Sequence, residues 1–121
     1  MKGAFNLKTK IEKIKSDNCF ISEITLAELK FGVENSTNIQ KHQKALNDFM
    51  TWVKVVPIFH SLDLYAKEKA RLRKAGTPVD EFDILIGVTA VKHNLVMVTN
   101  NTKEFSRLQE IQIEDWTREE I

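Results

Sequence analysis

Asp83 lies among the apolar residues Phe82, Ile84, Leu85 and Ile86 in the helical stretch "VDEFDILIGVTAVKHN" (residues 79–94). An ionised carboxylate that is taken out of water needs a cation or hydrogen-bond donors to compensate its charge. The sequence therefore predicts a compensating partner for Asp83, and that partner is a first candidate for the function.

Two further polar features fall where a parallel α/β sheet gathers its functional groups. Glu28 follows the first apolar strand, in "ITLAELKFGVEN" (residues 24–35), and Asn100 and Asn101 come directly after the apolar strand "LVMVT" (residues 95–99). Oxygen ligands of this kind suit a hard cation such as Mg²⁺ or Mn²⁺. Such a cation would compensate Asp83, lower the pKa of a bound water and balance the charge that develops on a phosphate during hydrolysis.

Each of these residues also has a purely structural interpretation. Thr25 and Glu28 have the spacing of a capping box, and a carboxylate in the first helical turn, such as Asp83, interacts favourably with the helix dipole. Asn101 taken singly is typical of a turn, and Glu104 of a solvated surface. Periodicity alone favours the structural interpretation of each residue, so the metal hypothesis depends on their combination.

The elements that must position these residues alternate between helices and short apolar strands. Ser22 or Thr25 is a candidate cap for the helix that carries Glu28, and a later helix has Ser61 as a candidate cap and Gly76 as its expected left-handed stop. The pattern predicts helices over residues 5–18, 24–35, 38–53, 61–76 and 77–94, a helical turn over 101–108, and strands over 19–22, 53–59, 95–99 and 111–113. This alternation predicts an α/β domain with a mainly parallel sheet.

The composition excludes several classes of function. The 121 residues carry a net charge of +1, which gives no reason to expect nucleic-acid or membrane binding from the whole-molecule field. Cys19 is the only cysteine, which excludes an internal disulfide and a cysteine-based zinc site and favours a reducing, cytoplasmic setting. No apolar run approaches the roughly 20 residues of a membrane span. Scattered histidines and glycines argue against zinc hydrolysis and nucleotide-dependent chemistry.

Three stretches together resemble a PIN-domain ribonuclease of the VapC toxin group: "ISEITLAELKFGVENS", "GTPVDEFDILIGVTAVKHNLVMVTNNTKEFSRL" and the closing "IEDW". The resemblance covers nearly the whole chain from about residue 5 onward. It implies a three-layer α/β/α fold and a metal-dependent endoribonuclease that cuts RNA, in several members transfer RNA. It also implies a homodimer that is held inactive by a cognate VapB-type antitoxin.

The resemblance assigns roles to individual residues. Glu28 matches the acidic residue of the family's "AEL" motif and Asp83 that of "FDxLI", and both are implied to bind Mg²⁺ or Mn²⁺. Asn101 matches a position where many members have a further carboxylate, and it is implied to orient water or the metal, with Thr99 supporting its turn. Basic residues at positions 8, 10, 13, 15 and 30, and in the run 67–74, are candidates for phosphate contacts.

The family's first strand, which ends in an "LDTN"-like motif whose Asp is a principal metal ligand, has no counterpart in the sequence. We therefore expect a single PIN-like domain over residues 1–121 whose sheet lacks its central strand. Loss of one carboxylate predicts weak metal binding and weak or absent nuclease activity.

The alternative function is a catalytically impaired remnant that only binds an antitoxin or dimerises. A misassigned start codon, degeneration of the toxin, or a gap filled by swapping or oligomerisation would each explain the difference.

Overall fold

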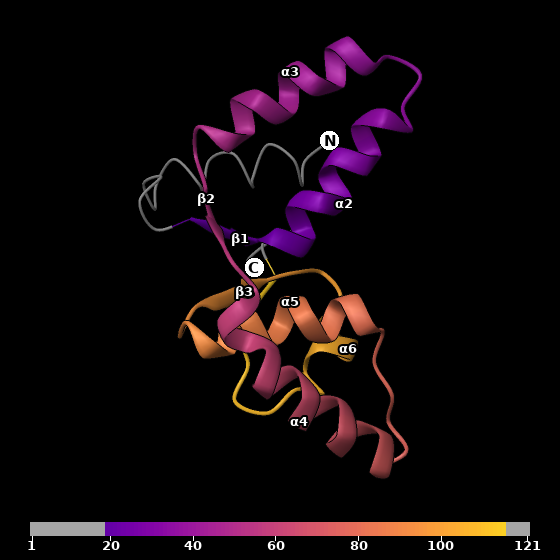
Figure 1. Ribbon diagram of the computed structural model, residues 1–121, viewed down its shortest axis with the longest axis vertical. Coiled ribbons are helices and arrows are strands. Elements are labelled where there is room, and N and C mark those ends of the chain that lie inside the picture. The colour runs from indigo at the N-terminus through magenta and orange to yellow at the C-terminus, as the bar shows by residue number, and fades with distance from the viewer. Residues whose placement is uncertain (1–18, 116–121) are drawn as a thin grey trace, which may run out of the picture.

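The computed structural model describes residues 19–115 as short strands joined by helices (Figure 1). The predicted helix over residues 5–18 lies outside these described residues. The elements are the strands β1 (Phe20–Ser22), β2 (Lys54–Val56), β3 (Val96–Val98) and β4 (Gln112–Glu114), the helices α2 (Glu23–Glu34), α3 (Ile39–Met50), α4 (Leu62–Lys74), α5 (Glu81–Lys92) and α6 (Thr102–Phe105), and the short 3-10 helix η2 (Phe59–Ser61).

All strand pairing in residues 19–115 is parallel, which confirms the predicted α/β class. β1 pairs with β2, with Ile21 opposite Val55, and β3 pairs with β4, with Met97 opposite Ile113. Each pair is closed by a helical crossover, α2–α3 in the first and α6 in the second, because parallel neighbours cannot be joined by a tight turn. The described strands thus form two two-stranded sheets instead of one continuous sheet.

The helix that carries Glu28 begins earlier than its capping-box interpretation requires. Ser22 is the N-cap of α2, and its side-chain oxygen accepts a hydrogen bond from the Thr25 N–H at 3.0 Å. Thr25 therefore lies inside the helix, and the capping-box interpretation of Glu28 is wrong. Glu28 occupies the middle of α2 with an exposed side chain, which leaves it available for another role.

The ends of α4 agree only in part with the prediction. Ser61 occupies the N-cap position, but its side chain makes no capping hydrogen bond, and its buried hydroxyl has no hydrogen-bond partner among the described residues. The helix stop is confirmed, because Gly76 has φ +73°. The Gly76 N–H donates to the Arg73 carbonyl and the Thr77 N–H to the Leu72 carbonyl, as in a Schellman motif.

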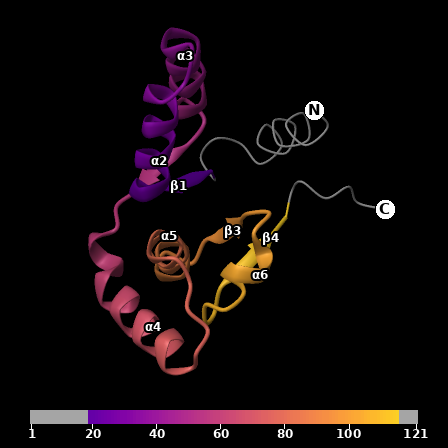
Figure 2. The same cartoon turned by 90° about the vertical axis from the view of Figure 1, so that its right-hand side faces the viewer.

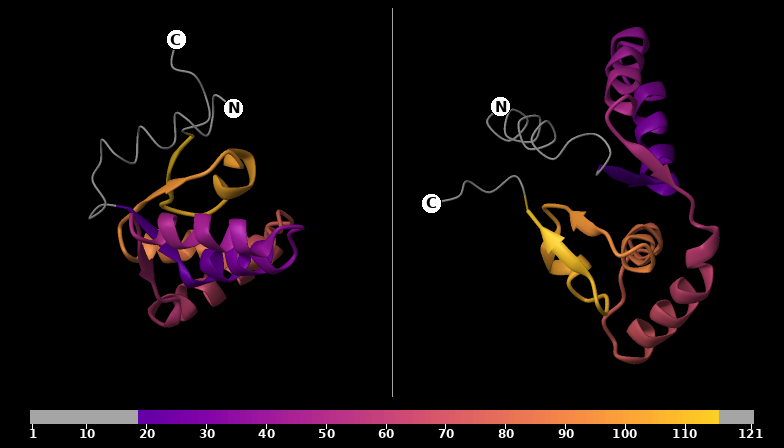
Figure 3. Two further views of the ribbon diagram at one scale, coloured as in Figure 1. Left: turned by 90° about the horizontal axis from the view of Figure 1, so that it is seen from above. Right: turned by 90° about the vertical axis from the view of Figure 1, so that its left-hand side faces the viewer.

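The apolar core lies around α5, the most deeply buried helix. Figures 2 and 3 show α5 between α4 on one side and the β3–β4 pair on the other, while α2 and α3 stand together above this unit as a helical arm. The buried cluster draws on α4, α5, α6 and the segment after it, and consists of Leu72, Ile84, Val88, Phe105 and Leu108. No helix within residues 19–115 is both long and apolar enough to cross a membrane.

Candidate functional site

Asp83 lies in the first turn of α5, where Asp80 caps the helix by accepting a hydrogen bond from the Phe82 N–H at 3.1 Å. Its side chain is half-buried, so the expected removal from water is partly borne out. Burial raises the pKa of the Asp83 carboxyl above its ordinary value. The negative charges of Glu104, Asp80 and Glu28 raise the same pKa further. Asp83 therefore lies in a concentrated negative field.

Glu28 reaches this field from a different helix. α2 and α5 are in contact, and Glu28 lies in a groove of about 460 Å³ that is lined by residues of both helices. Its charge acts on Asp83 across that contact, although 55 positions separate the two residues in the sequence. The structure thus places Glu28 on a helix that contacts the helix of Asp83, and the charge of Glu28 is the smallest of the causes that raise the pKa of Asp83.

Glu104 belongs to the same acidic cluster, and its partly exposed carboxylate accepts hydrogen bonds at both oxygens. The Asp80 N–H donates to one Glu104 carboxylate oxygen at 3.1 Å, and the Asn101 side-chain amide donates to the other at 3.1 Å. The hydrogen bond from Asn101, followed by that from Asp80, lowers the pKa of Glu104 below its ordinary value. The sequence contains one signal for this pair. Asn101 and Glu104 are three positions apart at the start of α6, the spacing of a capping box.

Asn101 ends the turn after β3, as the sequence predicted. Its N–H donates to the Thr99 side-chain oxygen at 3.0 Å, so Thr99 supports the turn as expected. Its side-chain amide nitrogen is directed to Glu104, which leaves the amide oxygen as its only possible metal donor. The role of Asn101 at the site stays a prediction.

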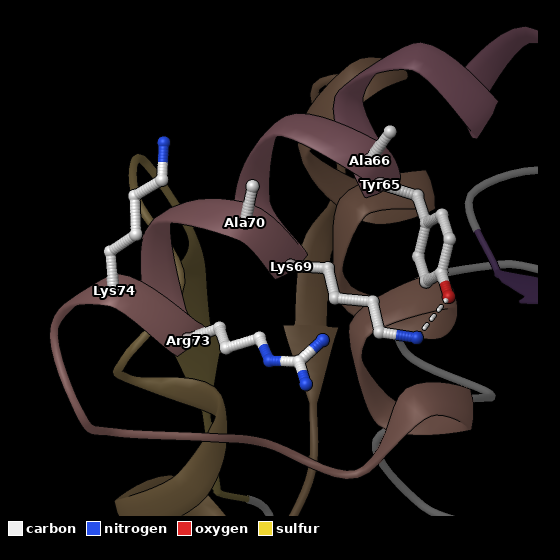
Figure 4. A pocket seen from close by; sticks show the side chains of 6 residues that line it. All are labelled: Tyr65, Ala66, Lys69, Ala70, Arg73 and Lys74. Carbon is white, nitrogen blue, oxygen red and sulfur yellow. Dashed lines mark hydrogen bonds between the residues drawn. The ribbon is translucent and has the colours of Figure 1, made fainter.

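A second groove, of about 400 Å³, runs along α4 and carries positive charge. Figure 4 shows Lys69 directed toward the hydroxyl of Tyr65, with Arg73 and Lys74 further along the helix. Glu81 accepts hydrogen bonds from the Tyr65 hydroxyl and, at 2.6 Å, from the Lys69 ammonium, which ties the first turn of α5 to α4. The Glu81 carboxylate raises the pKa of Lys69, and Lys69 lowers the pKa of Glu81.

The acidic cluster, which we define as Glu28, Asp83 and Glu104, matches a hard divalent cation in charge and donor chemistry. All three residues offer carboxylate oxygens, and the repulsion that Glu104 and Glu28 exert on Asp83 is the feature that a cation would relieve. Among the described residues, the number of side chains that could bind one ion together is too small for a complete site. Within residues 19–115, no three or more His, Cys, Asp or Glu side chains come close enough together to hold one ion. Any ion bound here would therefore retain water molecules among its ligands.

Comparison with known proteins defines the class of this fold. Residues 2–111 match the sequence model of the PIN domain, and the chain therefore belongs to the PIN-domain family. This confirms the resemblance found in the sequence and the expected α/β fold.

Within the family, the chain is similar to VapC ribonucleases. It is 34% identical over 119 residues to the tRNA(fMet)-specific endonuclease VapC of Salmonella typhimurium strain LT2, covering 93% of this chain and 90% of that protein. It is 31% identical to ribonuclease VapC2 of Rickettsia felis, covering 86% of this chain and 78% of the other. The structure superposes on DNA-bound VapBC from Salmonella typhimurium with a TM-score of 0.84 at 31% identity, covering 92% of this chain and 84% of that one.

Proposed function

We propose that this chain is an endoribonuclease of the VapC type that hydrolyses RNA phosphodiester bonds at the acidic cluster. The observation that supports the proposal most strongly is that the charges of Glu104 and Glu28, on two other helices, act on the half-buried Asp83 in a PIN-domain fold. The similar proteins from Salmonella typhimurium and Rickettsia felis are named as an endonuclease and a ribonuclease. The function predicted from the sequence and this geometry therefore agree.

In this proposal Glu28 and Asp83 contribute carboxylate ligands to a divalent cation, Mg²⁺ or Mn²⁺, and water molecules complete its coordination. When bound, such a cation supplies a more acidic water and neutralises charge on the phosphate. The residues of the chain position the site. Glu104 is oriented by its hydrogen bonds from Asp80 and Asn101, and Asp83 is oriented by the first turn of α5. The half-buried position of Asp83 limits the access of bulk water, which strengthens its interaction with any cation.

We propose transfer RNA as the substrate, because the similar Salmonella typhimurium VapC is named as specific for tRNA(fMet). The basic residues on α4 differ in how well they could bind the phosphate backbone, because some of them are already paired within the protein. Arg71 is committed to Glu68 and to the Arg107 carbonyl, and Lys69 to Glu81. Arg73 and Lys74, which line the α4 groove, are better placed to contact phosphates.

We further propose a cognate VapB-type antitoxin as the protein partner and the cytoplasm as the setting. Similar solved structures are VapBC complexes, from Salmonella typhimurium and from Haemophilus influenzae. A homodimer stays a prediction, and sedimentation analysis of the isolated chain would test it.

The deciding experiment is cleavage of purified transfer RNA by the full chain over a range of Mn²⁺ concentrations. We expect cleavage that requires the metal and that Asp83→Asn abolishes. Because no three ligating side chains of residues 19–115 surround one ion, we expect half-maximal cleavage only at high Mn²⁺ concentration. Asp48→Asn, the same change at an exposed position on α3, is the matched control and should leave cleavage unchanged.

The alternative function, an impaired remnant that only binds a partner, predicts the opposite pattern. The chain would then form a stable complex with the antitoxin, but neither the native sequence nor Asp83→Asn would cut RNA at any metal concentration. Cleavage that survives Asp83→Asn would place the reaction outside the acidic cluster and would also contradict the proposal.

A further inference from the structure

Two exposed aromatic rings lie in the groove that contains Glu28. Phe31, on α2, is 68% exposed, and Phe82, on α5, is 53% exposed. The groove is completed by Ile24 and Ala27 of α2, so its walls are apolar apart from the Glu28 carboxylate. An apolar groove with a few polar groups is the usual form of a binding site for a small, flat, partly apolar group.

Exposure alone does not distinguish these rings, because Phe59 on η2 is 72% exposed as well. Their position does. Glu28 and Phe31 are three residues apart and therefore lie on one face of α2, and Phe82 immediately precedes Asp83 in the chain. The two rings thus line the same groove as Glu28, one member of the acidic cluster, and Phe82 is the chain neighbour of Asp83, another member. Phe59 is not among the residues that line that groove.

We propose that Phe31 and Phe82 stack on an unpaired nucleobase of the RNA next to the phosphodiester that is cut. This inference rests on the proposed function, which places the reacting phosphate at the acidic cluster. Aromatic side chains bind splayed-out bases through their flat faces, and this contact is available only where the RNA is single-stranded. The two residues therefore select for unpaired nucleotides at the cleavage site and position the backbone beside the carboxylates.

Stacking makes a specific demand on the side chain, which allows matched variants. Phe31→Tyr and Phe82→Tyr keep the ring and should keep RNA binding. Phe31→Leu keeps an apolar side chain but removes the ring, so it should behave like Phe31→Ala. Base stacking is typically worth enough that its removal should weaken binding by about 5- to 150-fold. Phe59→Ala removes an equally exposed ring outside the groove and should have no effect.

The test measures binding separately from cleavage. The full chain carrying Asp83→Asn, which should not cut, is titrated with short single-stranded RNAs that contain the fluorescent base 2-aminopurine at successive positions. We expect quenching at one or two adjacent positions, retained in the tyrosine variants and lost in Phe31→Ala and Phe31→Leu. A self-complementary duplex of the same sequence should show no such quenching.

Several results would overturn the inference. Equal RNA affinity of Phe31→Ala, Phe31→Leu and the parent chain would exclude stacking, and so would quenching that is retained in Phe31→Leu. Variants that bind RNA normally but lose a copurified antitoxin would assign the groove to a protein partner. The proposed function would survive each of these results if Asp83 still controls cleavage, so the two failures can be told apart.

Discussion

Asp83 is the residue at which the proposed function works against the stability of the fold. Its carboxylate is half-buried and repelled by Glu104, Asp80 and Glu28, so the metal-free protein holds its negative charge at a cost. We therefore expect Asp83→Asn to raise the unfolding temperature of the chain in the presence of a chelator, by roughly 2–8 °C for a gain of about 1 kcal/mol in a domain of this size. Thermal denaturation followed by circular dichroism measures this difference.

Mn²⁺ should reverse the order of the two proteins. A cation that binds only the folded state stabilises it by mass action, and the native carboxylate should gain more from it than the amide. If Asp83→Asn were less stable than the native chain in chelator, the repulsion described at this site would not be a property of the folded protein.

Asn101 contacts the acidic cluster through Glu104, to which its side-chain amide donates a hydrogen bond. Asn101→Ala removes that bond, so the Glu104 carboxylate loses one of the two donors that lower its pKa and orient it. Losses of such orienting groups typically cost about 10- to 100-fold in metal affinity or activity. Mn²⁺ titration of the variant by calorimetry checks the affinity, and an unchanged dissociation constant would deny Asn101 any role at the site.

At the scale of elements, Glu68 connects α4 to the segment that follows α6. This carboxylate is 5% exposed, pairs with Arg71 through two hydrogen bonds of 2.9 Å and accepts a third from the Gln109 N–H at 3.1 Å. The hydrogen bond with Arg71 is the main cause that lowers the pKa of Glu68 from its ordinary value of 4.5, against the opposing effect of burial. This network fixes the position of residues 107–109 against the helix.

The lowered pKa makes the Glu68 contribution depend on pH. A carboxyl whose pKa is lower in the folded than in the unfolded chain stabilises the fold above pH 4.5 and loses this effect as the pH falls through its folded value. Glu68→Gln should therefore cost about 1–3 kcal/mol of unfolding free energy at neutral pH, and less as the solution is acidified. Urea denaturation at several pH values measures this, with the exposed Glu34→Gln as control; a difference independent of pH would contradict it.

At the scale of the whole molecule, burial is uneven. α5 contributes five buried residues, whereas α3 contributes only Leu46 and α2 only Val33. Helices with few buried contacts open at lower free energy than those in the core. We expect the amide hydrogens of α5 to exchange only through global unfolding and those of α3 to exchange much faster.

Native-state hydrogen exchange followed by mass spectrometry would show this gradient, and equal protection of α3 and α5 would contradict it. The prediction that residues 1–121 form a single domain can be tested on the same sample. Calorimetry should then give one cooperative transition, whose calorimetric and van't Hoff enthalpies agree.

The sequence by itself determined the local structure of the described residues. Helix α4 with its stop at Gly76, and a helix that carries Asp83 among apolar residues, follow from interactions between residues close in the chain. The start of α2 was open between two caps, and only the observed hydrogen bond to Ser22 removed the capping-box interpretation of Glu28.

Only the tertiary structure decided how the site is assembled. The hydrogen bond between Glu104 and the Asp80 N–H joins residues 24 positions apart, and the field of Glu28 reaches Asp83 through the packing of α2 on α5. The exposure of Phe82 also depends on what packs against α5. Periodicity and capping report on neighbours within about four residues, so they place each side chain on an element but do not determine which elements meet.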